Sequence, residues 1–438
     1  MKIGVISLGC AKNLVDTEYL LGLLKESDQE IVRNPEEAEA VIINTCGFIQ
    51  SAKEEAIRTI FDVLDWKEEH AVRKVIVMGC LAKRYKPELE EEIPEVDRFI
   101  SIDEYDHLGT ILSDELGVPV HNTYGKAPRM LSGKPWMAYL RIAEGCDNRC
   151  AYCAIPNIRG PLVSYPLEQL VREAEELAAQ GVRELTLIAQ DTSRYGYDWD
   201  RKLHLSELLK RLDVIEGLHW IRILYMYPDE IPDDLIDTIK ASKHILPYFD
   251  IPIQHGCDAV LKAMHRRSNA AEILDRTARI RASFAHPVLR TTLICGFPGE
   301  TAAQHEENLE MMRKVRWDHL GAFTYSPEEG TASYEMVDNV PQAEKQRRLN
   351  EIMNLQDEIV REDRQKMIGL EDEVLVEEVE GLTGMYLARS AMFAPDAVDG
   401  YVRFRCEEDL PAGTFCRVRY TRVSGQNLLA EYLGTVAL

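Results

Sequence analysis

The chain has 438 residues, of which 45% are hydrophobic, and its formal net charge is −23 at pH 7. This length exceeds what one hydrophobic core usually serves, so we expect two or three domains, and the composition excludes the disordered and fibrous classes. Because surfaces that bind phosphates are basic, broad nucleic-acid binding is disfavoured. No apolar stretch is long enough to cross a membrane, and the apolar start, which is as short as a strand, is no signal peptide, so we expect a cytoplasmic protein.

Residues 1–116 alternate apolar segments with helical ones. The apolar segments, which we expect to be buried parallel strands of an open α/β sheet, are 3–8, 40–44 and 74–78. A cysteine follows each of them, namely Cys10, Cys46 and Cys80. Sheets of this kind bind ligands beyond the carboxyl ends of their strands. A single cysteine there usually packs in the core, but three in the same topological position indicate a metal site.

Residues 118–135 are rich in turn-forming residues and predict a linker. A second series of strands and helices follows, with expected strands at 137–144, 183–189, 220–225, 247–253, 288–295 and 320–325. Helical patterns, such as the one at 167–180, separate most of these strands. Parallel strands joined by short helices predict a barrel or part of one, and barrel chemistry gathers at the carboxyl ends of the strands.

Three cysteines with the spacing C-x3-C-x2-C follow the first of these strands: Cys146, Cys150 and Cys153. Three thiolates with no fourth partner nearby indicate an incompletely ligated metal centre, in which one open iron can bind a substrate. A structural zinc site closes with four ligands, whereas soft thiolates select iron–sulfur clusters, so we favour the cluster. Zinc binding and plain packing of the thiols remain alternatives.

The other strand ends offer candidates for cofactor binding: Gln190, Gln254, Gly296 and Glu300. A glycine lets the backbone approach a ligand closely, although a plain strand-to-helix turn explains the same glycine. Beyond the cysteines we expect no catalytic side chain.

The last part of the chain consists of a long charged helix at 341–368, which we expect to be a scaffold, and alternating β segments at 371–438, which predict a small barrel. The β segments contain six arginines, no lysine and twelve carboxylates, a net charge of −6. Such a surface suits a basic protein partner better than RNA.

Residues 138–164 resemble the radical S-adenosylmethionine (SAM) superfamily. That resemblance implies a [4Fe-4S] cluster on Cys146, Cys150 and Cys153 whose open iron binds SAM, within a partial (β/α)6 barrel. The order of units resembles the methylthiotransferases over nearly the whole chain. It implies an N-terminal methylthiotransferase α/β domain at 1–116, a radical SAM core at 132–369 and an OB-like TRAM domain at 371–438.

Four motifs resemble the RimO-type branch of that family: SLGCAKNLVDTE at 7–18, INTCGFI at 43–49, EGCDNRCAYCAIP at 144–156 and PIQHG at 252–256. This branch modifies an aspartate of small-subunit ribosomal protein twelve. The tRNA-modifying, MiaB-like branch typically has Gln-Met-Asn where this chain has Ala11, Lys12 and Asn13.

The resemblance implies a second [4Fe-4S] cluster on Cys10, Cys46 and Cys80 that delivers sulfur. A 5′-deoxyadenosyl radical from SAM and a methyl group from a further SAM then give a methylthio group on the aspartate β-carbon. The implied partners are the ribosomal protein, free or in the ribosome, and a reducing electron donor such as flavodoxin. Three alternatives remain: a tRNA adenosine methylthiotransferase, which a basic groove would favour, a redox-sensing iron–sulfur regulator, and a non-enzymatic binding module, for which two open groups of cysteines serve no evident role.

Overall fold

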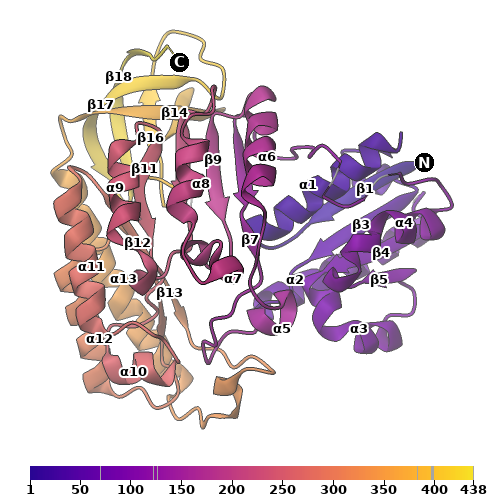
Figure 1. Ribbon diagram of the computed structural model, residues 1–438, viewed down its shortest axis with the longest axis horizontal. Helices are drawn as coiled ribbons and strands as arrows, with labels where there is room; N and C mark the ends of the chain where they lie inside the picture. Colours follow the sequence, from indigo (N-terminus) through magenta and orange to yellow (C-terminus); the bar gives the residue numbers. More distant parts are fainter. Residues whose placement is uncertain (70, 122, 126, 382, 396–398, 438) are drawn as a thin grey trace.

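The computed structural model describes residues 1–69, 71–121, 123–125, 127–381, 383–395 and 399–437. Three units follow one another along the chain: a five-stranded sheet, a six-stranded sheet and a closed five-stranded barrel (Figure 1). The predicted fold class is therefore confirmed. In the part of the chain that is described, no helix is long and apolar enough to cross a membrane.

The N-terminal sheet has the strand order β2-β1-β3-β4-β5, and all its strands are parallel. Its strands are β1 (Lys2–Ser7), β2 (Glu30–Ile31), β3 (Ala40–Thr45), β4 (Lys74–Gly79) and β5 (Arg98–Ile100). Helices α2 (Gln50–Glu69) and α3 (Cys80–Glu92) cover one face, and α1 (Ala11–Glu26) and α4 (Leu108–Leu116) cover the other. The three predicted strands are confirmed to within one residue, because apolar runs buried on both faces are a strong local signal.

The core sheet contains six strands in chain order from β6 to β13, all parallel. The strands are β6 (Met137–Arg141), β9 (Glu184–Ile188), β10 (Trp220–Ile223), β11 (Ile245–Asp250), β12 (Val288–Cys295) and β13 (His319–Thr324). The connecting helices include α6 (Leu167–Ala179), α8 (Leu205–Leu212), α9 (Asp233–Ala241), α11 (Ala270–Ser283) and α12 (Ala302–Val315).

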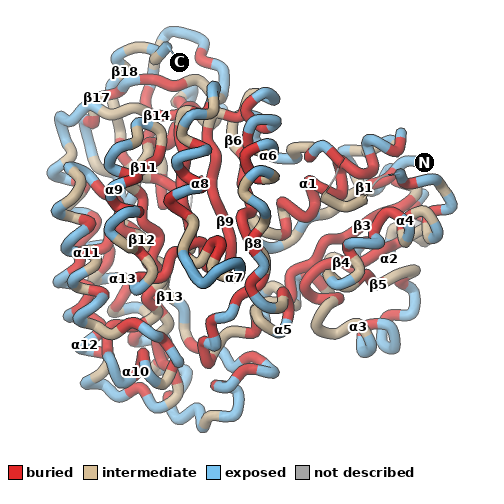
Figure 2. Tube along the Cα trace, viewed as in Figure 1, coloured by how far each residue is buried: buried red, intermediate tan, exposed pale blue. Residues whose placement is uncertain are grey.

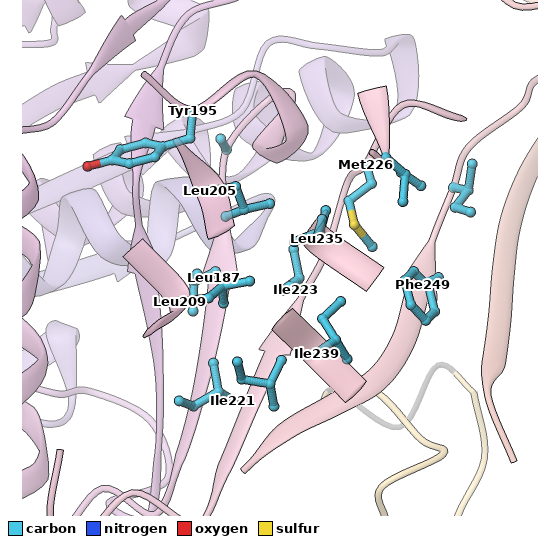
Figure 3. Close-up of a cluster of buried hydrophobic side chains, with 14 of the residues drawn as sticks. Leu187, Tyr195, Leu205, Leu209, Ile221, Ile223, Met226, Leu235, Ile239 and Phe249 are labelled. Carbon is cyan, nitrogen blue, oxygen red and sulfur yellow. The ribbon is translucent and has the colours of Figure 1, made fainter. Parts of the chain in front are cut away.

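One face of the core sheet packs against these helices. Figure 3 shows Ile221 and Ile223 of β10 beside Leu235 and Ile239 of α9. Burial follows the same pattern throughout, with buried strands behind helices whose outer faces are exposed (Figure 2). The opposite face is lined by the alternate residues of each strand, such as Arg222, and is the inner face of the partial barrel.

The first predicted core strand, 137–144, is divided in the structure. Its first part is β6, and its second part, β7 (Ala143–Glu144), pairs antiparallel with β8 (Val163–Ser164) in a separate ribbon. Ile142 lies between them, with its N–H donated to Ile188 O at 2.9 Å and its carbonyl accepting from Tyr165 N at 3.0 Å. The cysteine loop and the short helix α5 (Ile155–Arg159) therefore lie on this ribbon and not directly on the sheet.

The predicted linker 118–135 has no helix or strand among its described residues, but it is anchored. Buried Arg129 pairs with Glu18 of α1 at 2.6 Å and with Glu173 of α6 at 2.9 Å. The segment therefore fastens the N-terminal unit to the core, which its turn-rich composition did not indicate.

The terminal barrel follows the helix α13 (Gln342–Gln365), which confirms the predicted long helix. Its strands are β14 (Glu371–Glu380), β15 (Met385–Ser390), β16 (Val402–Arg405), β17 (Phe415–Ser424) and β18 (Asn427–Thr435). The barrel lies at the amino ends of the core strands, where Phe415 stacks edge-on against Trp220 with 4.9 Å between ring centroids. It is thus at the opposite end of the core from the expected chemistry.

A buried charge triad joins this barrel to the inner face of the core. Glu184 of β9 accepts from Arg222 Nε at 2.9 Å and from Arg389 Nη1 of β15 at 3.1 Å, and all three side chains are almost fully buried. Burial by itself would raise the pKa of Glu184, but Arg389 and Arg222 more than offset it and lower that pKa.

We predict that Glu184→Gln lowers the free energy of unfolding by about 3–5 kcal/mol at neutral pH, because buried Arg222 loses its counter-charge and Arg389 keeps only its pair with Glu377. Because the pKa of Glu184 is lower in the folded than in the unfolded protein, its carboxylate stabilises the fold fully at pH values above the unfolded-state pKa. This stabilisation is lost as the pH falls from the unfolded-state pKa through the folded-state pKa. Urea denaturation followed by circular dichroism measures the change. Glu371→Gln, in an exposed pair with Arg419, is the control and should leave the midpoint unchanged. Equal midpoints for both variants would contradict the role of the triad.

Candidate functional site

The first group of cysteines lies along one edge of the N-terminal sheet. Cys10 precedes α1, Cys46 directly follows β3, and Cys80 begins α3 after β4. Gly9 has a φ of +90°, and a Cβ there would lie 2.6 Å from Cys46 Cβ, so the loop before Cys10 runs directly against Cys46. The topology therefore brings together the three thiols that were predicted to share a site.

Asn13 of α1 ties these loops to one another. Its fully buried side-chain amide donates to Leu8 O at 3.1 Å and to Thr45 O at 3.0 Å, across the ends of β1 and β3. Its carbonyl oxygen accepts from Cys80 Sγ at 3.5 Å. One side chain thus fixes the strand ends that position all three cysteines.

The second group lies in the loop between β7 and α5. The N–H of Asn148 donates to Cys146 Sγ at 3.4 Å, and Cys150 Sγ lies 3.0 Å from the Tyr227 hydroxyl and 3.7 Å from Arg266 Nη1. Hydrogen-bond donors and a guanidinium around the sulfur atoms stabilise thiolates, which are the form that binds metal.

Burial raises the pKa of Cys146 to about 11 and that of Cys153 to about 12. The protein without metal therefore keeps these thiols protonated at neutral pH, and metal binding has to release their protons. None of the ten cysteines is joined in a disulfide.

Arg159 of α5 connects the two groups of cysteines. Its Nη2 lies 2.9 Å from Asp16 Oδ2 and 3.4 Å from Cys80 Sγ, and its Nη1 lies 3.1 Å from Glu144 Oε2. Cys80 also packs against Ala154, the neighbour of Cys153, in one small apolar cluster. The two groups of cysteines are therefore adjacent, one on each side of the boundary between the units.

Asp16 is the buried centre of this charged network. Besides Arg159 it pairs with Arg141 of β6, and it accepts from the Tyr124 hydroxyl at 2.6 Å. Burial would raise the pKa of Asp16, but the two arginines lower it, so the carboxylate is charged. Arg141 also reaches Glu144 at 3.0 Å, which closes the network next to the Cys146 loop.

Among the described residues, no three His, Cys, Asp or Glu side chains are arranged to hold a single metal ion. A mononuclear zinc ion needs its ligands on one centre, whereas a cubane spreads its thiolates because each binds a different iron. The adjacent loops and the donors on the sulfur atoms fit clusters of the cubane type.

The remaining candidates are placed differently. Gln190 donates to Glu144 Oε1 at 3.0 Å and so joins the charged network. Gln254 has a φ of +71° and bridges to β12, with its N–H donated to Thr292 O at 2.9 Å. Its role in cofactor binding stays a prediction.

Gly296 and Glu300 have a packing reason for their identities. A Cβ on Gly296 would lie 2.3 Å from Lys345 Cγ, and the buried Glu300 carboxylate accepts from Gly296 N and pairs with Arg348 at 3.1 Å. Contacts of these two residues with SAM also stay predictions.

Sequence reasoning did not single out Asp16, Arg159 or Lys12, although all three lie within or beside the quoted motifs. Asp16 directly follows Val15 in a helix that also contains Leu20, and all three are fully buried. A charged residue on the buried side of such a helix is the signal that could have indicated a partner.

Family models match each of the three units. The uncharacterized protein family UPF0004 matches residues 2–101, the radical SAM superfamily matches residues 140–312, and the TRAM domain matches residues 368–433.

Similar proteins extend over nearly the whole chain. The ribosomal protein uS12 methylthiotransferase RimO of Desulforamulus reducens is 44% identical over 98% of this chain and 99% of its own. The protein of the same name from Aquifex aeolicus is 43% identical over 98% of this chain and 96% of its own. The solved structure of the radical SAM methyltransferase TsrM from Kitasatospora setae has a TM-score of 0.56 at 12% identity, over 73% of this chain and 72% of that one, which shows a shared fold.

We predict that Arg159→Met and Asp16→Asn each destabilise the protein and that their effects are not additive, because both remove the same buried contact. The coupling should be about 0.5–3 kcal/mol by urea denaturation of the two single variants and the double variant. The control is the exposed pair of Arg211 and Glu168, whose substitutions should be additive. Additive effects at positions 16 and 159 would contradict the contact between the units.

Proposed function

The chain belongs to the ribosomal protein uS12 methylthiotransferase family of radical SAM enzymes, and we propose that it attaches a methylthio group to the β-carbon of an aspartate in small-subunit ribosomal protein twelve. The observation that carries the proposal is the adjacency of the two groups of cysteines across Arg159. An enzyme that both activates a carbon and adds sulfur to it needs its two centres around one substrate atom.

As a radical SAM enzyme of this family, the protein uses SAM and [4Fe-4S] clusters. We assign Cys146, Cys150 and Cys153 to the cluster that binds SAM, and we assign the other cluster to Cys10, Cys46 and Cys80. When bound, these groups supply a 5′-deoxyadenosyl radical that removes a hydrogen atom from the β-carbon, a sulfur atom from the second cluster and a methyl group from a further SAM.

The side chains around Cys150 tune and shield this centre. Tyr227 and Arg266 place a hydroxyl and a positive charge at the sulfur, and such contacts set the reduction potential of a cluster. Ala151 packs with buried Met264 and Phe297 behind the loop. This apolar wall keeps water from the reacting atoms.

The acidic surface favours a protein substrate over tRNA. The terminal barrel has a net charge of −6 and the whole chain one of −23, so phosphates are repelled and a basic ribosomal protein is attracted. Because the barrel lies at the amino ends of the core strands, we assign it to a part of the substrate away from the reacting aspartate.

Three further assignments follow from this reading. The three domains span residues 1–116, 132–369 and 371–438. A reducing donor such as flavodoxin supplies the electron that SAM cleavage consumes. The enzyme works in the cytoplasm, where its substrate is. SAM binding by Gln190, Gln254, Gly296 and Glu300 belongs to the same proposal.

We predict that the anaerobically reconstituted protein holds close to two [4Fe-4S] clusters per chain. Replacing Cys146, Cys150 and Cys153 together by Ala should leave about half of the iron and abolish 5′-deoxyadenosine formation, because each group of cysteines closes its own centre. Iron analysis and chromatography of the SAM products measure both effects.

Replacing Cys10, Cys46 and Cys80 should also leave about half of the iron, but it should preserve 5′-deoxyadenosine and abolish the methylthiolated product. Cys406→Ala, in the terminal barrel, is the control and should change neither quantity. Full methylthiolation by the variant without Cys10, Cys46 and Cys80 would refute the division of labour between the two centres.

We predict the outcome when the enzyme is offered uS12, intact small subunits and unmodified tRNA in parallel. It adds a methylthio group to uS12, free or in the small subunit, and leaves the tRNA unmodified. The acidic surface and the family membership give the reason, and mass spectrometry of each substrate gives the measurement. Modification of the tRNA alone would show that the chain acts as a tRNA adenosine methylthiotransferase.

A further inference from the structure

We propose that Lys12 is the specificity-determining residue that binds the side-chain carboxylate of the substrate aspartate. This inference rests on the proposed function. It is carried by an ammonium group that lies near both groups of cysteines and forms no ion pair within 4.0 Å with a carboxylate of the described residues.

Lys12 lies in the first turn of α1, two residues after Cys10, and its side chain crosses to the core. Its Nζ lies 3.7 Å from the centroid of the Tyr225 ring. Tyr225 lies two residues after the end of β10, so it stands at the carboxyl end of the core strands, on the same side as the Cys146 loop. The ammonium group therefore lies where both groups of cysteines meet.

The ring under the ammonium group is held in a strained position. Tyr225 has a φ of +63°, which is rare for a bulky residue and costs about 1–2 kcal/mol. Its N–H donates to Asp250 Oδ2 at 3.0 Å, and its carbonyl accepts from Thr192 N at 2.9 Å. Backbone strain that neighbouring groups hold in place is found at functional sites, and here it fixes a platform for a cation.

The carboxylates in the neighbourhood are already committed to other cations. Glu144 pairs with Arg141 and Arg159, and Asp250 pairs with Arg290 at 3.2 Å. Among the residues that the structure describes, no carboxylate lies within 4.0 Å of Lys12 Nζ and none accepts a hydrogen bond from it. The half-buried ammonium group thus keeps its three donors for a ligand.

The side-chain carboxylate of the substrate aspartate fits the ammonium group of Lys12. An aspartate carboxylate is bonded directly to the β-carbon, so a carboxylate held at Lys12 places the β-carbon between the two centres. A charge-assisted hydrogen bond from ammonium to carboxylate is stronger and more directional than one between neutral groups. Asparagine has the same shape without the charge and is therefore the matched probe.

The test uses the full-length, anaerobically reconstituted enzyme and two forms of uS12: the natural protein and a variant with the target aspartate changed to asparagine. The affinity of each form is measured by fluorescence anisotropy for the wild-type enzyme, Lys12→Met and Lys12→Arg. We expect the wild type to prefer the aspartate form by about 10- to 100-fold. Lys12→Met should bring the ratio close to one, and Lys12→Arg should restore part of it.

The ratio separates recognition from a structural role. If Lys12 only holds α1 against the core, Lys12→Met weakens both forms equally and keeps the ratio, which overturns the assignment. Lys202→Met is the control, because that lysine side chain is 78% exposed, and it should keep the wild-type ratio.

Methylthiolation by the wild-type enzyme distinguishes a failure of the Lys12 assignment from a failure of the proposed function. If the wild type modifies uS12 and Lys12→Met keeps the preference for aspartate, the assignment of Lys12 fails and the proposed function stands. If the wild type modifies tRNA and leaves uS12 unmodified, both the proposed function and the assignment of Lys12 are wrong.

Discussion

The buried pairing of Asp16 with Arg141 and Arg159 is the interaction on which the arrangement of this protein depends. A charge in the interior is costly unless it is paired, so the buried Asp16 carboxylate requires the two arginines that the core provides. The same contact sets the distance between the two groups of cysteines, because Arg159 bonds to Asp16 and to Cys80 Sγ with one guanidinium group. These ion pairs thus hold the two groups of cysteines next to each other, as the proposed reaction requires.

The connection between the first two units follows the same rule. Arg129, from a segment without regular structure, is buried between Glu18 and Glu173 on helices of different units. Ion pairs of this kind add less stability than apolar contacts of the same size, but they accept only one arrangement of the partners. A fixed relative position of two metal centres calls for that specificity.

Much of the fold follows from local sequence patterns. The apolar runs of β1, β3 and β4 and the cysteines behind them predict both the strands and the edge where the thiols gather, because strand direction and topology fix that edge. The division of the first core strand at Ile142 was not predicted, since no glycine or proline in residues 137–144 marks a break. The pairing of Asp16 with Arg159 was also missed, because a contact between residues 143 positions apart leaves no periodic signal.

The triad of Glu184, Arg222 and Arg389 limits the exchange of the terminal barrel between enzymes. Here β15 contributes one member of a charge cluster whose other two members belong to the core. A barrel grafted from a different enzyme would have to provide an arginine at the position of Arg389, or it would leave the Glu184 carboxylate with a single partner. Exchange of the barrel between enzymes is therefore restricted to donors that carry an arginine at this position.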